Sequence, residues 1–487
     1  MLQKKFINVS QGKLSNTQLL LFLIVLVGLV LRLAFFSGMG ISDSLTYSKT
    51  AYDLGESKGI DPESTLTLST RLGLIYTTAL SYKLFAINNF SSVLFVLLTS
   101  IGSIILIFYF GKLLFNERTG LMAAFLLSFF PLDMVYATKL LTDIPSAFFM
   151  ALGVYLFLYS EKVSKLKYSM GYLFAGIFIG IGYLIRESAL LIVLFFIIYI
   201  LYKRKIKKEY FLVPLGVLLI FVIEALIFFS LTQDLFFRTQ ASQQVLAKVV
   251  IANNYYGRLD FPTGLFHYPY IILTNNLISY FYIFIFIAIL YCLARKKKET
   301  YILLFWFIPL LLYLSFGSSS FTQYLPFIAK ARYLTIITIP GILLLAFFLV
   351  GKGHFIKRVA MSLALILLLT SVVSVYLRED RNLLDNLNIV SPYLKGLDKP
   401  IYMDSRSIKV LDYILKYKNE IDARRYTTDL KIIKDAYILV NKDMIRRLKE
   451  SNNNTKFPVE IDNPLENWKI TKEIGKGENR IIIYFAS

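Results

Sequence analysis

Long apolar runs separated by short polar segments make up the chain as far as about residue 378. A helix needs about 20 mostly apolar residues to cross the hydrocarbon core of a bilayer, and by that measure about eleven segments span the membrane. They are residues 18–36, 90–110, 119–136, 144–160, 169–186, 188–202, 210–231, 270–294, 300–317, 332–351 and 358–377. The segments beside Pro131, Pro145 and Arg186 are short, and the pattern defines them least sharply. The pattern therefore predicts a polytopic α-helical membrane protein.

The charges of the loops predict how these helices are oriented. Lys and Arg gather in every second loop, which is typical of cytoplasmic loops in polytopic membrane proteins. The basic loops contain Lys112 and Arg118, then Lys162, Lys165 and Lys167, then Lys203, Arg204, Lys205, Lys207 and Lys208, then Arg295, Lys296, Lys297 and Lys298, and finally Lys352, Lys357 and Arg358. We therefore expect a cytoplasmic N-terminus, and an odd number of spans places the C-terminus outside.

The first long outside loop, residues 37–89, combines a predicted helix with a candidate base. Residues 71–85 place apolar side chains at helical spacing with polar ones between them, which predicts an amphipathic helix at the membrane interface. Asp43, in the stretch Gly40 to Tyr47, is the first acid of the chain. A carboxylate just outside a membrane helix could serve as a base, whereas the alternative is a solvated loop residue or a cap of the next helix.

The composition changes near residue 379, where apolar runs shorten to strand length and charge becomes more frequent. We predict a transmembrane catalytic domain at 1–378 and a small extracytoplasmic α/β domain at 379–487. The expected strands are residues 400–405, 436–440, 468–471 and 480–485, the last two paired, and the expected helices are 406–418 and 442–450. The second domain contains no glycine-rich phosphate loop and no acid/base constellation.

The composition supports a membrane protein and excludes several other classes. The chain of 487 residues is 56% hydrophobic and 17% charged, whereas a soluble protein has about a quarter charged residues. A net charge of +21 suggests nucleic acid in a soluble protein, but here the charges lie in predicted cytoplasmic loops, where anionic membrane lipids are the expected contact. A single cysteine, Cys292, excludes an intrachain disulfide, and His267 and His354 are too few for a His-rich zinc site.

Several charged residues lie beside apolar runs on the predicted outside face, where the positive-inside bias disfavours cations. They are Asp43, Lys139, Asp143, Arg186, Glu187, Lys330 and Arg332. A carboxylate among several cations suits a substrate with an anionic group such as a lipid phosphate. The alternative is that each cation snorkels or pairs locally, as Lys139 would with Asp143 four residues on. Glu224, inside the seventh span, is a further candidate, and its alternative is a buried glutamate bonded to a neighbouring helix.

These positions form part of a series of short motifs. In chain order the motifs are Leu31-Arg32-Leu33, Asp43-Ser44-Leu45-Thr46-Tyr47 with Ala51, Leu54 and Gly55, Arg71-Leu72-Gly73, Tyr109 to Phe115, Phe130-Pro131 leading to Lys139 and Asp143, Gly176 to Arg186, Tyr324-Leu325-Pro326, and Ala331 to Leu334. Over roughly residues 18–350 the chain resembles the GT-C superfamily of polyprenyl-phosphate-sugar-dependent membrane glycosyltransferases. It is most similar there to the group that contains protein O-mannosyltransferases and the lipid A aminoarabinose transferase.

The resemblance implies an inverting glycosyltransferase that moves a sugar from a polyprenyl-phosphate donor to an acceptor hydroxyl at the outer membrane face. By that resemblance Asp43 is the general base, Asp143 is the acid of the second outside loop, and Arg186 and Arg332 bind the donor phosphate. Lys139 is a further candidate for the phosphate, and the candidate substrate-binding residues are Tyr47, Arg71, Glu224 and Tyr333. Many relatives have two adjacent acids in the first loop, but here Ser44 follows Asp43. We therefore predict no required cofactor or metal, and a divalent metal stays an open alternative.

The expected partners are a polyprenyl-phosphate-linked sugar, membrane lipids, and a lipid, glycan or protein acceptor, with no nucleic acid. The expected location is the cell (plasma) membrane, and the expected process is glycosylation in the cell envelope. One alternative is a polytopic transporter or flippase of lipid-linked saccharide, but we find no clear internal repeat and the candidate charges lie at one face. Another alternative is a protein like an O-antigen ligase or polymerase, in which His267 would serve.

Overall fold

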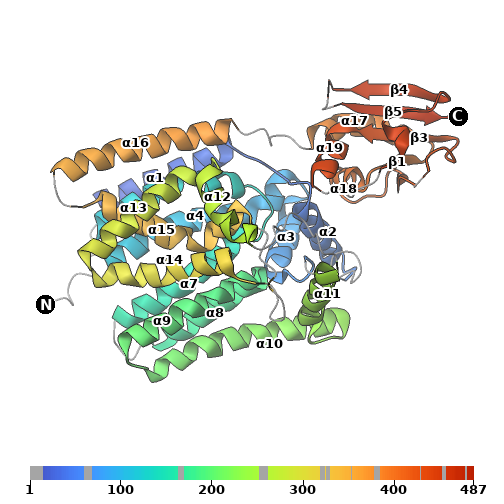
Figure 1. Cartoon of the computed structure of the whole chain (residues 1–487). Coiled ribbons are helices and arrows are strands. Elements are labelled where there is room, and N and C mark those ends of the chain that lie inside the picture. Colours follow the sequence, from blue (N-terminus) through green and yellow to red (C-terminus); the bar gives the residue numbers. More distant parts are fainter. Residues whose placement is uncertain are drawn as a thin grey trace.

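The protein is a bundle of long apolar helices with a small sheet domain at one end, as Figure 1 shows. The computed structural model describes residues 15–59, 68–162, 169–251, 262–318, 324, 329–351, 354–377, 384–427, 429–451, 457–475, 477 and 480–487. This architecture confirms the predicted fold class, a polytopic helical membrane protein with a small C-terminal α/β domain. The proposed division between residues 378 and 379 falls outside the described residues and stays a prediction.

Each predicted apolar segment contains a helix of the bundle. The helices are α1 (Asn16–Ala34), α4 (Asn89–Leu114), α5 (Glu117–Ser128), α6 (Pro131–Tyr136), α7 (Asp143–Lys162), α8 (Ser169–Ile185), α9 (Val193–Lys203), α10 (Leu212–Thr232), α13 (Ser279–Arg295), α14 (Lys298–Phe316), α15 (Thr335–Leu349) and α16 (His354–Tyr376). Among the described residues, six helices are long and apolar enough to cross a membrane by themselves. Shorter apolar helices occupy Met170–Ile185, Tyr280–Arg295 and Ser362–Tyr376.

Two of the predicted spans are interrupted, so the total number of spans stays a prediction. In the span expected at 119–136, α5 ends at Ser128 and Pro131 begins the short helix α6. Proline is favoured at the first position of a helix and cannot continue a preceding one, which explains the break. In the span expected at 188–202, a 3-10 helix, η2 (Glu187–Ile192), precedes α9.

The loops at the end of the bundle near the sheet domain contain more helix than the sequence pattern predicts. The amphipathic helix expected at 71–85 is confirmed as α3 (Leu72–Phe85). Asp43 is not in an extended loop, because it is the first residue of another helix, α2 (Asp43–Gly55). The second long outside loop, between the spans predicted at 210–231 and 270–294, contains α11 (Phe237–Ile251) and η4 (Thr263–Phe266), neither of which was expected. It ends in α12 (His267–Thr274), a short helix that continues into the predicted span.

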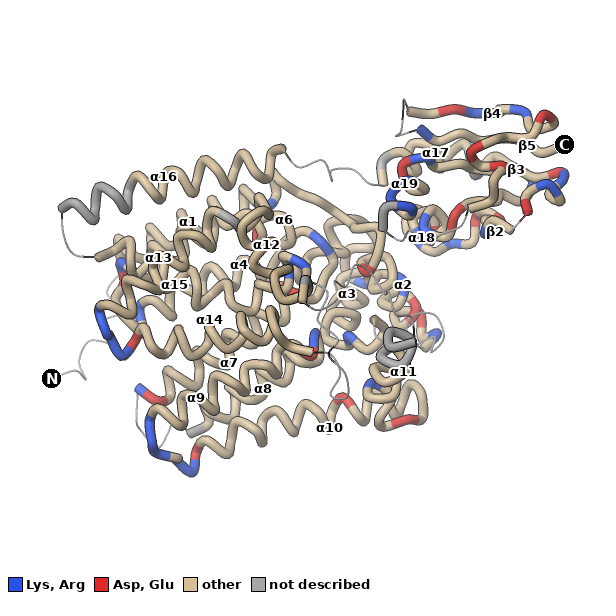
Figure 2. Tube along the Cα trace, viewed as in Figure 1, with Lys and Arg blue, Asp and Glu red and all other residues tan. Residues whose placement is uncertain are grey.

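Basic residues gather at the opposite end of the bundle, as Figure 2 shows. The loop between α9 and α10, which includes η3 (Lys208–Phe211), and the loop between α13 and α14 both lie there, away from α2 and α3. Two of the basic loops predicted to be cytoplasmic are therefore at the same end of the helices. Which end faces the cytoplasm stays a prediction that rests on the positive-inside rule.

The C-terminal domain is a five-stranded sheet in the order β2-β1-β3-β5-β4, covered by helices. Its strands are β1 (Ile401–Met403), β2 (Ala423–Arg425), β3 (Ala436–Asn441), β4 (Trp468–Ile474) and β5 (Ile481–Ala486), and its helices are α17 (Asp385–Lys395), α18 (Ser405–Ile414), α19 (Lys442–Ser451) and η6 (Val459–Ile461). Strand β1 is parallel to β2 and β3, whereas β5 is antiparallel to β3 and β4. The predicted strands and helices are confirmed, but β2 and α17 were not predicted.

A fully buried ion pair connects α1, α4 and α6. The side chain of Arg32 on α1 is 0% exposed and forms an ion pair with Asp133 on α6. Its Nε donates a hydrogen bond of 2.7 Å to Ser100 Oγ on α4, and its Nη1 donates one of 2.9 Å to the carbonyl oxygen of Gly28. Burying a charge is unfavourable by several kcal/mol unless a partner and hydrogen bonds compensate, so this pair fixes how the three helices pack.

Substitution of Arg32 by Met should strongly destabilise the protein, because it leaves the Asp133 carboxylate buried without its cation. We expect a loss of about 3–5 kcal/mol in the free energy of unfolding. The matched control is Lys112→Met, which removes one partner of the exposed Lys112–Glu117 pair (2.8 Å). Exposed pairs contribute at most about 1 kcal/mol. Chemical unfolding of both purified variants in detergent measures the difference, and equal losses would contradict the assigned role of the Arg32–Asp133 pair.

Candidate active site

Hydrogen bonds attach the start of α2 to the segment that precedes α7. The backbone N–H of Ser37 donates to Thr138 Oγ1 at 2.9 Å, and Ser44 Oγ donates to the carbonyl oxygen of Leu140 at 3.0 Å. Asp43 and Asp143 are consequently the first residues of two helices whose N-termini are brought together. The N-terminal end of a helix dipole is positive and attracts a carboxylate, so an acid is electrostatically favoured at both of these positions.

Two arginines far apart in the sequence pair with these acids. Arg186, between α8 and η2, forms an ion pair with Asp143. Arg332 lies in the 3-10 helix η5 (Ala331–Leu334), directly before α15, and its Nη2 donates a hydrogen bond of 2.9 Å to Asp43 Oδ2. The Nε of Arg332 is also 3.7 Å from Asp143 Oδ2. The charges therefore follow one another in the order Asp43, Arg332, Asp143, Arg186, with opposite signs at each step.

Tyr333 lies against both guanidinium groups of this chain of charges. The guanidinium carbon of Arg186 is 4.2 Å from the centre of the Tyr333 ring, and that of Arg332 is 5.6 Å from it. An aromatic face attracts a cation and restricts its side chain. The ring therefore helps to hold both guanidinium groups in place.

A polar cavity of about 470 Å³ opens beside Asp43 and Arg332. Its lining carries one carboxylate, that of Asp43, and three cations: Lys139, Lys330 and Arg332. The Asp43 side chain is 30% exposed, whereas the Asp143 side chain is 2% exposed and does not line the cavity. A small anionic group would find an excess of positive charge in this cavity, next to an accessible carboxylate.

The local charges control the protonation of Asp43. Burial by itself raises the pKa of this carboxyl group, but the Arg332 guanidinium and the Lys330 ammonium outweigh burial, and the pKa is lower than its ordinary value. Asp43 is therefore a carboxylate at neutral pH. As long as Arg332 stays bound to it, the same interaction makes it a weak proton acceptor.

The remaining phosphate candidate is Lys139, for which a local pair with Asp143 was the alternative explanation. Its Nζ lies 5.6 Å from the centre of the Tyr136 ring, and the residue lines the cavity. Asp143 forms its ion pairs with Arg186 and Arg332 instead. Tyr47, one turn after Asp43 on α2, is buried and 3% exposed.

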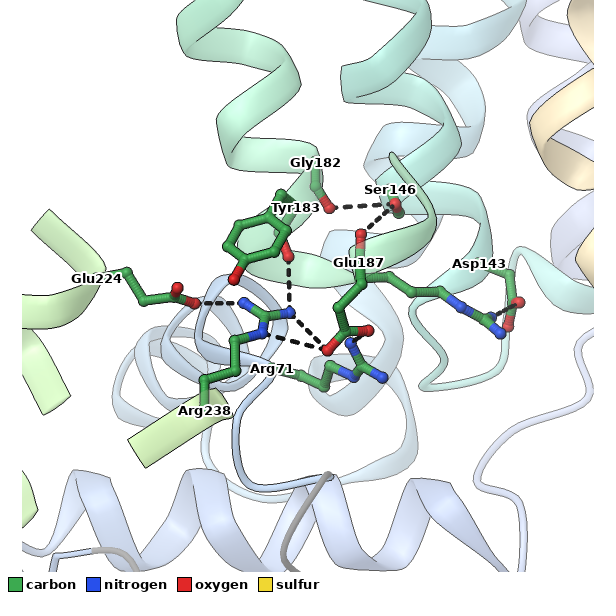
Figure 3. A network of polar contacts seen from close by, with 9 residues as sticks. Arg71, Asp143, Ser146, Gly182, Tyr183, Glu187, Glu224 and Arg238 are labelled. Carbon is green, nitrogen blue, oxygen red and sulfur yellow. Dashed lines mark hydrogen bonds and ion pairs between the residues drawn. The ribbon is translucent and has the colours of Figure 1, made fainter. Parts of the chain in front are cut away.

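Two other predicted substrate-binding residues, Arg71 and Glu224, belong to a network that adjoins the Asp143–Arg186 pair, and Figure 3 shows this network together with Asp143. Arg71 pairs with Glu187, and Arg238 on α11 pairs with both Glu187 and Glu224. Arg238 also donates a hydrogen bond of 2.9 Å to the carbonyl oxygen of Tyr183. These contacts match the alternative interpretation of Glu224 as a buried glutamate bonded to a neighbouring helix. A role in substrate binding stays a prediction for both residues.

Arg238 was missed by the site prediction, whereas Glu187 was among the candidate outside charges but received no role. Both are charges of the predicted outside loops, and Arg238 lies on the unexpected helix α11. An acid inside an apolar helix needs a cation partner, so Glu224 was a signal that such a residue had to exist. The sequence offered no means to choose among the cations of the second long loop.

The residues around the cavity do not fit a divalent metal. Metal sites for hard cations use several oxygen ligands, but one carboxylate and three cations surround this cavity. Among the described residues, no group of three or more His, Cys, Asp or Glu could hold a metal ion. The absence of a required metal remains a prediction, and we assign no chemical step to one.

The chain is similar to known proteins in part of its sequence and in its fold. Residues 72–228 match the family model of dolichyl-phosphate-mannose-protein mannosyltransferases, a segment that includes Lys139, Asp143, Arg186 and Glu224 but not Asp43 or Arg332. No curated protein sequence matches the chain significantly.

Solved structures share the fold over nearly the whole chain. ArnT from Cupriavidus metallidurans in the apo state is 14% identical with a TM-score of 0.65, covering 96% of this chain and 98% of that one. The same protein bound to undecaprenyl phosphate is 13% identical with a TM-score of 0.61, covering 96% and 97%. The archaeal oligosaccharyltransferase AglB from Archaeoglobus fulgidus, in complex with an inhibitory peptide and a dolichol-phosphate, is 13% identical with a TM-score of 0.55, covering 82% and 63%. These matches show that the chain has the same fold, and together with the match to the family model they agree with the resemblance found in the sequence.

The network around Arg238 predicts an asymmetry between single and double substitutions. Arg238→Met should lower the free energy of unfolding by about 3–5 kcal/mol, because it leaves Glu224 buried and unpaired. Arg238→Met combined with Glu224→Met removes both buried charges and should regain most of that stability. Thermal unfolding in detergent compares the three proteins. If the double variant is no more stable than the single one, the two side chains do not act as a pair.

Proposed function

We propose that the protein is an inverting glycosyltransferase that moves a sugar from a polyprenyl-phosphate donor to an acceptor hydroxyl at the extracytoplasmic membrane face. The observation that carries this proposal is the cavity in which a carboxylate, Asp43, lies beside the cations Arg332, Lys330 and Lys139. The fold supports such a donor, because the similar ArnT and AglB structures contain undecaprenyl phosphate and dolichol-phosphate. The basic loops at the other end of the bundle support the assignment of the face, with the N-terminus cytoplasmic.

The cations of the cavity act on the leaving group. When the bond between the anomeric carbon and the phosphate oxygen breaks, negative charge develops on the phosphate, and preorganised cations stabilise that charge. Arg332, Lys330 and Lys139 reach the cavity directly. Arg186 does not line it, but Arg186 shares Asp143 and the Tyr333 ring with Arg332 and completes the positive side of the site.

Asp43 acts on the acceptor. As the acceptor oxygen attacks the anomeric carbon, Asp43 accepts the proton of the acceptor hydroxyl, and the polyprenyl phosphate leaves from the opposite side. A single displacement of this kind inverts the anomeric centre. Asp43 fits the role because it is the partly exposed acid, whereas Asp143 is held between two arginines and positions them.

The Asp43–Arg332 pair also gives an order to the reaction. In the ligand-free site Arg332 binds Asp43, and the donor phosphate competes with that carboxylate for the same guanidinium. When the phosphate binds Arg332, Asp43 loses its closest positive neighbour, and its pKa rises. Asp43 thus becomes a better base when the donor is in place, which favours binding of the donor before activation of the acceptor.

Substitution of Asp43 by Asn should abolish sugar transfer without unfolding the protein. Loss of a general base lowers rates by about 10²–10⁴-fold. Membranes with the wild type or the variant would be incubated with a panel of radiolabelled undecaprenyl-phosphate and dolichyl-phosphate sugars, and the fraction that takes up label would be measured. Glu56→Gln, which changes an exposed acid just after the end of the same helix, is the control and should transfer normally. Wild-type rates in the Asp43 variant would contradict its role as base.

Substitution of Arg332 by Ala should move the acid limb of the pH profile of kcat/KM to higher pH. Arg332 and Lys330 lower the pKa of Asp43 and burial raises it, so removal of Arg332 raises this pKa and leaves less carboxylate at acidic pH. Lys330→Ala should shift the limb in the same direction by less, and Lys83→Ala, an exposed cation on α3, should not shift it. An unmoved acid limb in Arg332→Ala would show that Asp43 is not the titrating group.

A further inference from the structure

A second polar cavity, of about 230 Å³, lies between α2 and the C-terminal domain. Helix α2 contributes Leu45, Thr46, Lys49, Thr50 and Asp53 to its lining, and the C-terminal domain contributes Ser405, Ile408, Lys409, Asp412, Tyr417 and Arg425. Thr46, Thr50 and Asp53 follow Asp43 at intervals of three, four and three residues, which places all four on one helix face. The second cavity therefore begins about one helical turn from the candidate base.

Buried hydrogen bonds fix the two walls of this cavity relative to each other. Tyr417 Oη donates to Ser48 Oγ at 2.6 Å, and the Tyr52 and Tyr417 rings stack with their centres 4.9 Å apart. Tyr413 Oη is 3.0 Å from Ser92 Oγ and donates to Asn89 Oδ1 at 3.0 Å, which connects α18 to α4. Tyr413 and Tyr417 are nine-tenths or more buried, so the C-terminal domain is fastened to α2 and α4 and the cavity is preformed.

The charges that line the cavity are not balanced, because three cations (Lys49, Lys409 and Arg425) meet two carboxylates (Asp53 and Asp412). The side chains of Lys409 and Arg425 are exposed, so a ligand can reach them from solvent. Lys49 pairs with Asp53 at 2.6 Å and also acts on Asp412, so one cation faces two carboxylates in this part of the lining. In the parts of the chain that the structure describes, Lys409 and Arg425 have no carboxylate within ion-pair distance. Burial lowers the pKa of Lys409, and the neighbouring Arg425 and Arg406 lower it further, which means that like charges face each other there. An anion at Lys409 and Arg425 would relieve this repulsion.

We propose that this second cavity binds the acceptor, and that the acceptor is a carbohydrate carrying a phosphate or carboxylate group. The anionic group of the acceptor lies at Lys409 and Arg425, and its hydroxyl groups form hydrogen bonds with Thr46, Thr50 and Asp53. The threonine hydroxyls can both donate and accept hydrogen bonds, whereas the Asp53 carboxylate accepts them. The acceptor then extends along the face of α2, so that one of its hydroxyl groups reaches Asp43. This inference rests on the proposed glycosyltransferase function and specifies its second substrate.

Direct binding of defined sugars tests the inference without any donor. Saturation-transfer NMR on the full-length protein in detergent would use glucose 6-phosphate, glucuronic acid and neutral glucose as probes. We expect the two anionic sugars to bind saturably, and at least about tenfold more weakly to Lys409→Glu and to Arg425→Glu. Lys469→Glu, an exposed cation on β4, is the matched control and should bind as the wild type does. Equal affinity in all variants, or no saturable binding of either anionic sugar, would overturn the inference.

Two further arms separate the sources of the ligand and the two proposals. Phosphatidylcholine discs doped with phosphatidylinositol present a phosphorylated polyol on a lipid, and soluble inositol 1-phosphate presents it without one. If the discs bind and Lys409→Glu abolishes this binding, the inference is supported and the acceptor is a lipid. If inositol 1-phosphate binds and Lys409→Glu abolishes this binding, the inference is supported and the acceptor is a free glycan. Binding of either probe that this substitution leaves unchanged counts against the inference. All probes are also measured with Asp43→Asn. If the inference holds, this variant still binds the anionic sugars although it does not transfer sugar. If the wild type transfers sugar but does not bind the anionic sugars, the inference is wrong and the proposed reaction stands. If the wild type binds the anionic sugars but transfers no sugar, the proposed reaction is wrong and the inferred binding site stands.

Discussion

The Arg332 guanidinium, shared by Asp43 and Asp143, is the interaction on which the candidate site depends. It connects the first residue of α2, the first residue of α7 and the segment before α15, which are far apart in the sequence. Charges at the edge of an apolar bundle are unfavourable unless they are paired or reach water. The pairing that makes these residues tolerable in the fold also lowers the pKa of Asp43. In the proposed reaction it leaves the donor phosphate a cation for which to compete.

The same physical rule separates the charges that support the fold from those that face a ligand. Arg32 and Asp133 are buried and surrounded by hydrogen bonds, and Arg238 is compensated by Glu187 and Glu224. The residues around the two cavities are different, because Asp43 is partly exposed and each cavity contains cations in excess of the acids that compensate them. Helix α2 borders both cavities, so one short helix can bring a donor and an acceptor to the same carboxylate.

Apolar run length and loop charge were sufficient to predict the helical bundle, the amphipathic helix α3 and most strands of the C-terminal sheet, because these features depend on local periodicity. The position of Asp43 at the start of α2 could not be read in the same way, because the helix is held by Ser44 and Leu140 across the two loops. Strand β2 is three residues long, and its Ala-Arg-Arg sequence lacks strand periodicity. For the site, the resemblance named acids and arginines that the structure brings together. Their pairing and the partner of Glu224 depend on contacts between segments distant in sequence, which the sequence pattern does not show.

In the proposed reaction the donor phosphate and Asp43 compete for Arg332. The affinity of the protein for the lipid carrier tests this competition most directly. The dissociation constant of undecaprenyl phosphate would be measured for the purified wild type and for Asp43→Asn at the same pH and ionic strength. Removal of the competing carboxylate should tighten binding by about tenfold, since charge-assisted pairs of this kind contribute a few kcal/mol at most. Weaker or unchanged binding to Asp43→Asn would contradict the competition and the order of events that follows from it.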